Sequence, residues 1–300
     1  MTATHQQALQ AAHALGLDRL DAQLLLLHAL GRPDSDRAWL LAHDDDPLPQ
    51  PAADVLRRLS LRRAAGEPLA YIVGYKDFFG LRFAVDSRVL VPRPDTETLV
   101  QWVLDAAEKA MAETTRILDL GTGSGAIAVA VAATLSQNRL AGLTAATAYA
   151  VDAVDASAAA LAVAAENAKN LQANVQHVQS VQFIQSNWFD NVSGCYHVIA
   201  SNPPYIASAD PHLGALTHEP QEALTAGPDG LDDLYLIIEQ APAHLLAGGW
   251  LLLEHGYDQA DAVRARLTQR GFTQVQSRPD LAGIARCSGG QWLPAKTADK

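Results

Sequence analysis

The segment Asn202-Pro203-Pro204-Tyr205 offers the most distinctive chemistry in this chain. It follows an apolar run at residues 198–200, so it lies at the carboxyl end of an expected strand, where open α/β sheets bind ligands. Asn202 supplies a side-chain carbonyl, the prolines fix the backbone, and Tyr205 adds an aromatic face. This combination suits a planar amino group, because its N–H bonds need acceptors and its face needs a π partner. A rigid turn without a ligand is the alternative interpretation.

A glycine-rich loop precedes this segment in the chain and joins an expected strand to an expected helix; it consists of Gly121, Thr122, Gly123, Ser124 and Gly125. The glycines allow a tight turn and a close approach by a ligand, and the following helix N-terminus attracts a carboxylate or phosphate. The spacing differs from the dinucleotide fingerprint G-x-G-x-x-G. Taken alone, the loop is a weak signal, and a glycine turn that binds nothing is the alternative interpretation.

Two further side chains follow expected strands. Asp155 ends the second strand of the α/β region, where a carboxylate can accept hydrogen bonds from a ribose diol. Asp152 is its rival, and a solvated surface acid is the alternative for either; we prefer Asp155 because it leads directly into the next helix. Trp188 follows the third strand and could pack on an adenine ring, although plain core packing is commoner for a single aromatic residue.

The elements that position these residues alternate between strand and helix from residue 116 onward, which predicts a mostly parallel sheet with helices on both faces. Strands are expected at residues 117–120, 148–151, 181–184, 197–200 and 250–254. Helices are expected at residues 98–111, 126–135, 158–170, 234–246 and 260–270, before a hairpin-like tail. An inserted surface loop is expected at residues 136–147.

Before this region the chain reads as short helices with leucines at helical spacing, followed by a hairpin at residues 78–91 that turns at Gly80. We therefore expect three parts. They are an N-terminal helical domain at residues 1–72, a β-hairpin linker at residues 73–93 and a catalytic α/β domain at residues 94–300.

The bulk composition favours a small molecule or a protein as the partner. Of 300 residues, 49% are hydrophobic and 18% are charged, and the net charge is −11. Because nucleic-acid binding draws on Lys and Arg, this charge and the lack of a basic run argue against a nucleic-acid partner.

Cysteine and histidine usage predicts neither a metal site nor a disulfide framework. Cys195 and Cys287 lack metal-type spacing, and the ten histidines form no known metal pattern. No signal peptide is visible, and no apolar run is long enough to span a membrane. We expect a cytoplasmic protein that is a monomer.

The order of glycine loop, acidic strand end, aromatic residue and Asn-Pro-Pro-Tyr resembles class I S-adenosylmethionine-dependent methyltransferases that modify planar amino groups. Segments at residues 66–72, 91–97, 218–232 and 252–256 resemble the protein-(glutamine-N5) methyltransferases specifically, so the resemblance covers almost the whole chain. The sequence from Arg93 to Glu97, RPDTE, is similar to the branch that acts on peptide chain release factors. The branch that acts on a ribosomal protein typically has RSPIAE there.

This resemblance implies a class I methyltransferase fold and S-adenosylmethionine as the methyl donor. It implies methyl transfer to the glutamine of the GGQ motif in class I release factors, with the N-terminal helices recognising the protein. Residues 121–125 would then hold the methionine end of the cofactor, Asp155 the ribose and Trp188 the adenine. The Asn202–Tyr205 segment would hold the substrate glutamine, with Asn202 and Tyr205 catalytic and Asn202 also against the cofactor.

Two positions depart from the family pattern: Asn187 and His197 each stand where Asp is usual. An Asn187 carbonyl can still accept a bond from the adenine amino group, and we expect the change at His197 to be structural. Two alternative functions share the same cofactor loop and the same Asn-Pro-Pro-Tyr segment. They are a glutamine methyltransferase of a ribosomal protein and a nucleic-acid methyltransferase acting on adenine N6 or guanine N2.

Overall fold

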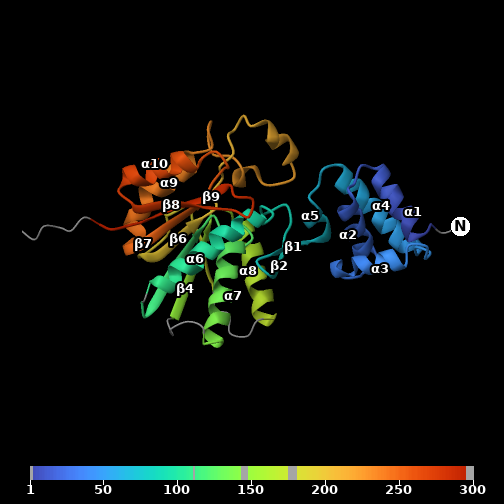
Figure 1. The fold of residues 1–300 in the computed structure, drawn as a ribbon, viewed down its shortest axis with the longest axis horizontal. Coiled ribbons are helices and arrows are strands. Elements are labelled where there is room, and N and C mark those ends of the chain that lie inside the picture. Colours follow the sequence, from blue (N-terminus) through green and yellow to red (C-terminus); the bar gives the residue numbers. More distant parts are fainter. Residues whose placement is uncertain (1–2, 111, 143–147, 175–180, 295–300) are drawn as a thin grey trace, which may run out of the picture. The chain divides into compact units, whose positions relative to one another are not determined.

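The structure, a computed structural model, describes residues 3–110, 112–142, 148–174 and 181–294, the side chains of 172–174 excepted. Backbone contacts divide the chain into two compact units, Met1–Tyr75 and Lys76–Lys300, and each is described by itself. Figure 1 draws the helical first unit in blue and the sheet of the second unit in green to red. The predicted boundaries at residues 72 and 93 stay a prediction, as does the recognition role of the first unit.

The first unit consists of short helices around a leucine core. They are α1 (His5–Ala14), α2 (Arg19–Ala29), α3 (Arg37–Ala42), α4 (Gln50–Ala64) and α5 (Leu69–Val73), with a 3-10 turn, η1 (Asp34–Asp36). The side chains of Leu25, Leu26 and Leu27 are fully buried, because α2 packs against α1, α3 and α4 on several sides. Thr4 caps α1 through a reciprocal pair of hydrogen bonds, and the Asp18 carboxylate caps α2.

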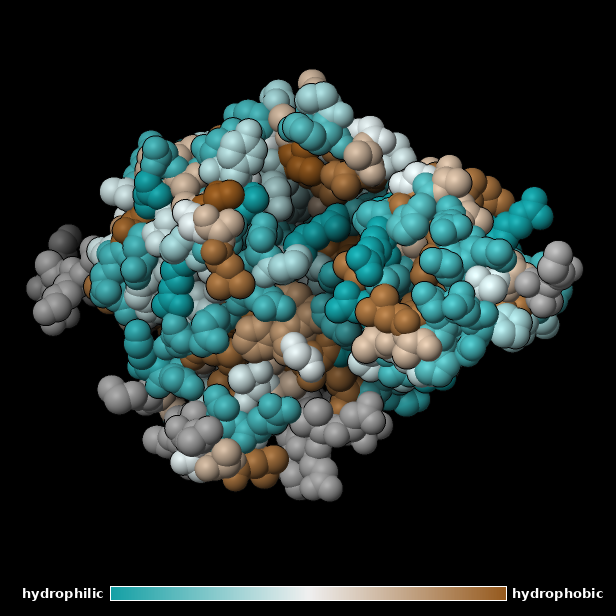
Figure 2. All heavy atoms as spheres, turned by 45° about the vertical axis from the view of Figure 1, so that its right-hand side comes forward, coloured by the Kyte–Doolittle hydropathy of each residue, from teal (hydrophilic) through white to brown (hydrophobic). Residues whose placement is uncertain are grey.

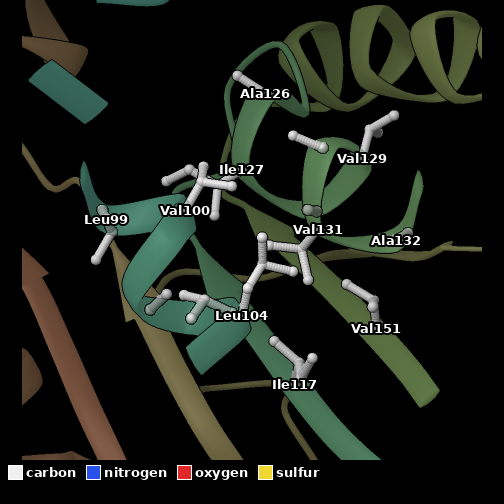
Figure 3. Packing of buried hydrophobic residues seen from close by; sticks show 14 of the residues in the cluster. Leu99, Val100, Leu104, Ile117, Ala126, Ile127, Val129, Val131, Ala132 and Val151 are labelled. Carbon is white, nitrogen blue, oxygen red and sulfur yellow. The ribbon is translucent and has the colours of Figure 1, made fainter. Parts of the chain in front are cut away.

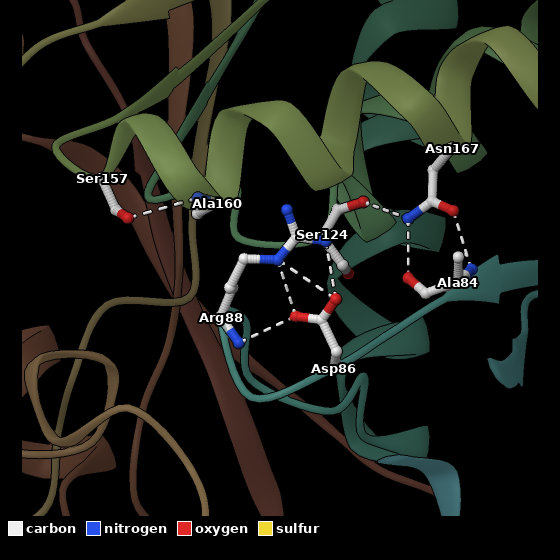
Figure 4. Close-up of polar contacts among 7 residues, drawn as sticks. All are labelled: Ala84, Asp86, Arg88, Ser124, Ser157, Ala160 and Asn167. Atoms are coloured by element: carbon white, nitrogen blue, oxygen red, sulfur yellow. Dashed lines mark hydrogen bonds and ion pairs between the residues drawn. The ribbon is translucent and has the colours of Figure 1, made fainter. Parts of the chain in front are cut away.

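A short hairpin follows, with β1 (Tyr75–Phe78) and β2 (Leu81–Ala84) joined at Phe79 and Gly80. Gly80 has φ +73, a conformation that suits glycine. The predicted hairpin at residues 78–91 was wrong in its extent, because no strand continues past Ala84 among the described residues. The Asn167 side-chain amide ties β2 to the rest of the second unit by accepting from the Ala84 N–H and donating to its carbonyl (Figure 4).

The second unit is built on a seven-stranded sheet in the order β5-β4-β3-β6-β7-β9-β8. Among the described strands of this sheet, β9 runs in the direction opposite to the other six, which all run the same way. The strands are β3 (Thr114–Leu120), β4 (Ala148–Asp155), β5 (Val181–Gln185), β6 (Tyr196–Ser201), β7 (Leu245–Glu254), β8 (Thr273–Pro279) and β9 (Ala285–Gln291). The helices are α6 (Glu97–Lys109), α7 (Ala126–Leu140), α8 (Ala158–Asn174), α9 (Asp232–Gln240) and α10 (Ala260–Arg270), with 3-10 turns η2 (Pro94–Thr96), η3 (Pro211–Ala215), η4 (Gln221–Ala223) and η5 (Ala241–His244).

Apolar residues on both faces of the central strands explain the layers. Side chains along a strand point alternately to opposite faces. Ile117 joins the core under α6 and α7, whereas its neighbour Leu118 joins the core under α9 and α10. Figure 3 shows the first of these cores, where Leu104 of α6 lies near Val131 of α7 and Ile117 of β3. The predicted class I methyltransferase architecture, a mostly parallel sheet covered on both faces, is therefore confirmed (Figure 1).

Two expected elements differ from the structure. Helix α7 continues to Leu140, so the predicted loop at residues 136–147 was wrong for its first five positions, and residues 143–147 lie outside the described part. The predicted helix at residues 234–246 ends at Gln240, since Pro242 has no N–H to continue the helical ladder. The chain then makes a 3-10 turn, and β7 begins at Leu245.

The face of the molecule drawn in Figure 2 carries both hydrophilic and hydrophobic residues. On the face drawn in Figure 2, hydrophilic residues in teal predominate and hydrophobic residues in brown form small groups. Among the helices that the structure describes, none is long and apolar enough to cross a membrane.

Candidate functional site

Two adjoining cavities lie where strands β3, β4 and β6 end. The first has a volume of about 290 Å³, and seven residues singled out from the sequence line it: Gly121, Gly123, Asp155, Asn187, Trp188, Asn202 and Pro204. The second has a volume of about 250 Å³, and its lining includes Asn202, Pro203 and Tyr205. Thr122, Ser124 and Gly125 line neither cavity.

Thr122, Ser124 and Gly125 instead make contacts that fix the conformation of the turn. The Thr122 hydroxyl donates to the Asp119 carboxylate across 2.6 Å, and the Thr122 N–H donates to the Val154 carbonyl across 2.8 Å. The Ser124 carbonyl accepts from the Asn167 side chain at 2.9 Å. Gly125, with φ +81, packs so closely that an added Cβ would lie 3.1 Å from Ala164 Cβ. The loop is thus held to β4 and α8 in one conformation.

Asp119 is a buried acid at the base of this loop. Its Oδ2 accepts from Thr122 and from the Ala128 N–H at 3.1 Å, which caps the start of α7. Its Oδ1 is buried and has no partner among the described residues. Burial raises the pKa of Asp119 from its ordinary value to about 7, although the two hydrogen bonds oppose that rise.

Asp155, not Asp152, faces the first cavity. The Asp155 carboxylate accepts from the Gly123 N–H and from the Ser157 N–H, each at 2.9 Å, so it links the glycine loop to the start of α8. Burial raises the pKa of Asp155, and these two bonds oppose the shift. Asp152 instead accepts from the Tyr196 hydroxyl at 2.7 Å and pairs with Arg116 at 3.2 Å, inside the sheet.

The edge of the first cavity is polar and charged around the start of α8. Figure 4 shows Arg88 paired with Asp86 near the first turn of α8, where the Ser157 hydroxyl accepts from the Ala160 N–H. Arg88 and Ser157 both line the cavity.

Trp188 forms an aromatic wall of the cavity. Its φ is +45, an unusual conformation for a bulky residue, and a Cβ added at Gly121 would lie 3.4 Å from its ring. The Asp233 carboxylate lies next to the Trp188 side chain and also lines the cavity. Asn187 lines the same cavity. The absence of a side chain at Gly121 therefore leaves the Trp188 ring open to a flat ligand.

Asn202 lies between the two cavities and carries an unused acceptor. Its side-chain nitrogen donates to the Thr96 hydroxyl at 3.3 Å, whereas its Oδ1 is buried without a partner among the described residues. The Tyr205 ring packs against the core under α9, and burial raises the pKa of its hydroxyl above the ordinary range. The Tyr205 carbonyl accepts from the Gln259 amide at 3.0 Å.

Comparisons with known proteins find matches for both the N-terminal helical unit and the unit that contains the sheet. Residues 3–74 match the PrmC N-terminal domain model, and residues 96–227 match the Methyltransferase small domain model. A release factor glutamine methyltransferase of Bordetella pertussis is 48% identical over 279 residues, which cover 92% of this chain and 95% of that relative. The one of Vibrio cholerae is 40% identical and covers 99% of this chain and 100% of its own. The chain belongs to the release factor glutamine methyltransferase family.

Among solved structures, the hMettl16 catalytic domain in complex with an RNA hairpin superposes with a TM-score of 0.53. The match covers 83% of this chain and 82% of that one at 17% identity, so it shows the fold alone. The methyl donor of this methyltransferase is S-adenosylmethionine, and the first cavity fits it in chemistry. Asp155 offers acceptor lone pairs for a diol, Trp188 a flat apolar wall, and Gly121 and Gly123 an approach free of side chains.

Sequence reasoning missed three residues of this methyltransferase that contact the Asn202–Tyr205 segment. The Thr96 hydroxyl accepts from the Asn202 amide, the Glu254 carboxylate lies next to both, and the Gln259 amide donates to the Tyr205 carbonyl. Glu254 carried a usable signal, because it is an acid at the end of an expected apolar strand, just as Asp155 is. Thr96 lies within the Arg93–Glu97 segment that carries the resemblance, whereas nothing local marks Gln259, which lies far along the chain from the segment it supports.

Proposed function

We propose that this chain transfers a methyl group from S-adenosylmethionine to the side-chain amide nitrogen (N5) of the glutamine in the GGQ motif of class I release factors. The observation that carries this proposal is the buried Asn202 Oδ1, which has no hydrogen-bond partner among the described residues. An unpaired buried acceptor costs free energy, so it is retained where a ligand supplies the donor.

The placement of Asn202 supports this assignment, because its side chain lines both cavities. The first cavity carries the groups that suit the cofactor. The second carries apolar walls from Ile206, Leu216 and Leu224, with Arg93 as the charged residue of its lining. A glutamine side chain has the matching form, since its methylene stem is apolar and its amide is polar. We therefore assign the second cavity to the substrate glutamine.

Methyl transfer requires that the amide nitrogen be oriented toward the methyl group, and it does not require a general base. An amide nitrogen is a poor nucleophile because its lone pair is delocalised into the carbonyl. The Asn202 Oδ1 and the Pro203 main-chain carbonyl would each accept one N–H, which aims the nitrogen at the methyl group and favours the charge it gains. The nitrogen lone pair forms the new N–C bond, and the electrons of the broken S–C bond leave with the sulfur as S-adenosylhomocysteine. The nitrogen then releases one proton to solvent.

Tyr205 presents an aromatic face to a reaction centre that carries positive charge, which favours the transfer through cation–π attraction. On the cofactor side, Gly121 and Gly123 would lie against the methionine end, Asp155 would accept from the ribose hydroxyls and Trp188 would pack on the adenine. A single glutamine gives little selectivity, so we assign recognition of the protein substrate to the N-terminal helical unit. We further propose that the chain acts as a monomer without direct contact to nucleic acid.

The test is to incubate the purified chain with S-adenosylmethionine and a class I release factor of its host, and then to map methylation by peptide mass spectrometry. One methyl group on the GGQ glutamine is expected, and Asn202→Ala should abolish it while cofactor affinity changes little. Asn191→Ala is the matched control, because Asn191 is exposed and lines neither cavity. An unmodified release factor despite cofactor binding would contradict the proposal and favour a ribosomal protein or a nucleic acid.

A further inference from the structure

Glu254 is a buried acid at the end of β7, beside Asn202 at the end of the neighbouring strand β6. Strands β6 and β7 are parallel neighbours in which Ser201 pairs with Leu253, so the next residues along the two strands are Asn202 and Glu254. Only 1% of Glu254 is exposed, and its Oε2 has no hydrogen-bond partner among the described residues. A buried carboxylate is costly, which makes its presence beside the proposed acceptor informative.

No ion pair among the described residues neutralises Glu254. The charged and titratable groups around it are Asp95, Tyr205, Arg286 and Cys287. Arg286 is the cation among them, and it pairs with Asp95 at 3.2 Å and with Asp280 at 3.3 Å. The polar side chains that lie next to the Glu254 carboxylate are those of Thr96 and Asn202, and both favour its charged form. The negative charge of Glu254 therefore lies next to Asn202, the side chain that we assign to the substrate amide.

These contacts determine which end of the Asn202 amide faces the substrate cavity. A carboxylate can only accept hydrogen bonds, so the NH₂ end of Asn202 must turn toward it. Thr96 acts in the same sense, because its hydroxyl oxygen accepts from the Asn202 amide at 3.3 Å, which leaves its proton available to the neighbouring Glu254 carboxylate. The hydroxyl is free for this role, since Thr96 makes no capping bond at the start of α6.

We propose that Glu254, acting with Thr96, is a positioning residue that holds the Asn202 carbonyl oxygen toward the substrate amide and strengthens it as an acceptor. This inference rests on the function proposed above. With the opposite orientation, Asn202 would present N–H donors to the N–H groups of the substrate, and the amide would be repelled. The negative charge behind the amide also polarises its carbonyl, which favours the positive charge that develops on the substrate nitrogen.

The ionisation of Glu254 then links turnover to pH. Burial raises the pKa of Glu254 to about 7, although the neighbouring Thr96 and Asn202 side chains favour its charged form. A protonated Glu254 offers a donor of its own and no charge, so the orientation of Asn202 is no longer enforced. Turnover should fall as the pH drops below about 7. Asp119 also has a pKa of about 7, so the pH profile is assigned by mutation.

The experiment compares the pH profile of kcat for the full chain and its Glu254→Gln variant, at saturating S-adenosylmethionine and release factor. We expect the variant to lose at least about tenfold in kcat at pH 8, with KM for both substrates within about threefold and the acid limb flattened. Asp152→Asn is the matched control: it removes another buried carboxylate of the same sheet, so both kcat and the acid limb should persist. Equal kcat and an unchanged acid limb in Glu254→Gln would overturn the inference, whereas a wild-type chain that methylates nothing would refute the proposed function instead.

A second pair of variants covers the case in which Glu254→Gln does not fold. Thr96→Val keeps the shape of the side chain but removes the hydroxyl, and we expect it to lower kcat while S-adenosylmethionine binding persists. Thr96→Ser restores the hydroxyl and should recover most of the lost rate. Equal kcat in Thr96→Val and wild type, or no recovery in Thr96→Ser, would overturn the positioning role.

Discussion

Gly230 lies so close to Tyr205 that a Cβ at this position would be 2.1 Å from the Tyr205 carbonyl oxygen. The Gln259 amide bridges the same region, donating to the carbonyls of Tyr205 and Asp229 at 3.0 and 3.2 Å. The loop before α9 is thus fitted directly against the Asn202–Tyr205 segment. A side chain at Gly230 has to push that segment away from the substrate cavity.

We expect Gly230→Ala to lose most of its turnover and to lower the free energy of unfolding by about 2 kcal/mol or more, because strain at φ +75 adds to the clash. Gly80→Ala is the control. Gly80 has φ +73, but a Cβ added there would have no neighbouring atom within 4 Å, so this variant reports the backbone strain alone. Thermal unfolding and methylation assays on both variants check this. Equal turnover in the two variants would show that the clash does not matter.

Asp155→Asn should weaken S-adenosylmethionine binding by about tenfold to a hundredfold, the range typical of a lost hydrogen bond to a charged group. The amide can no longer accept from Gly123, from Ser157 and from a ribose at once. Asp152→Asn should leave the affinity within about twofold, since Asp152 bonds Tyr196 and Arg116 away from the cavity. Calorimetric titration of both variants distinguishes the two acids. A stronger effect at Asp152 would reverse our assignment.

The raised pKa of Asp119, about 7, predicts a slope of stability with pH. Because the folded value lies above the unfolded one, the contribution of Asp119 is fully present below about pH 4 and is lost as the pH rises toward 7. Asp119→Asn should remove this part of the slope. Urea unfolding should therefore favour the variant over wild type more at pH 8 than at pH 5, by about 1 kcal/mol or more. A pH-independent difference between the two proteins would contradict the burial argument.

Trp188→Ala should weaken S-adenosylmethionine binding by about tenfold, because it removes the aromatic wall of the first cavity. Trp188→Phe keeps a ring but loses the indole N–H, which can donate to the neighbouring Asp233 carboxylate, so a smaller loss is expected. Fluorescence or calorimetric titration with S-adenosylmethionine ranks the variants. If Phe and Ala weaken binding equally, the hydrogen bond rather than the ring surface is what the cavity needs.

The sequence was sufficient for the parallel architecture and for the approximate place of the site. In parallel sheets the carboxyl ends of neighbouring strands meet at one edge, so Asp155 and Asn202 could be placed together from the strand pattern alone. Family membership agrees with the resemblance carried by the same motifs. The roles of the individual residues stay predictions until the variants are measured.

What the sequence could not supply is the direction of side chains inside loops and the pairing of distant strands. Thr122 and Ser124 belong to the glycine loop, yet the Thr122 hydroxyl donates to Asp119, the Ser124 main-chain carbonyl accepts from Asn167, and neither residue lines a cavity. Glu254 is separated from Asn202 by more than fifty positions in the chain, and only the pairing of β6 with β7 brings the two together. The strand pattern predicts that both strands end at the same edge of the sheet, but not that they are neighbours.

The strand order also affects how the chain folds during synthesis. Strand β6 lies between β3 and β7, so a growing chain that ends before Tyr196 leaves one edge of β3 without its partner. That edge belongs to the most deeply buried part of the sheet, where Leu118 and Leu120 are fully enclosed in the finished protein. An unpaired apolar edge is prone to aggregation. We therefore expect truncations between β5 and β6 to be insoluble, and the nascent α/β unit to need protection until β6 has emerged from the ribosome.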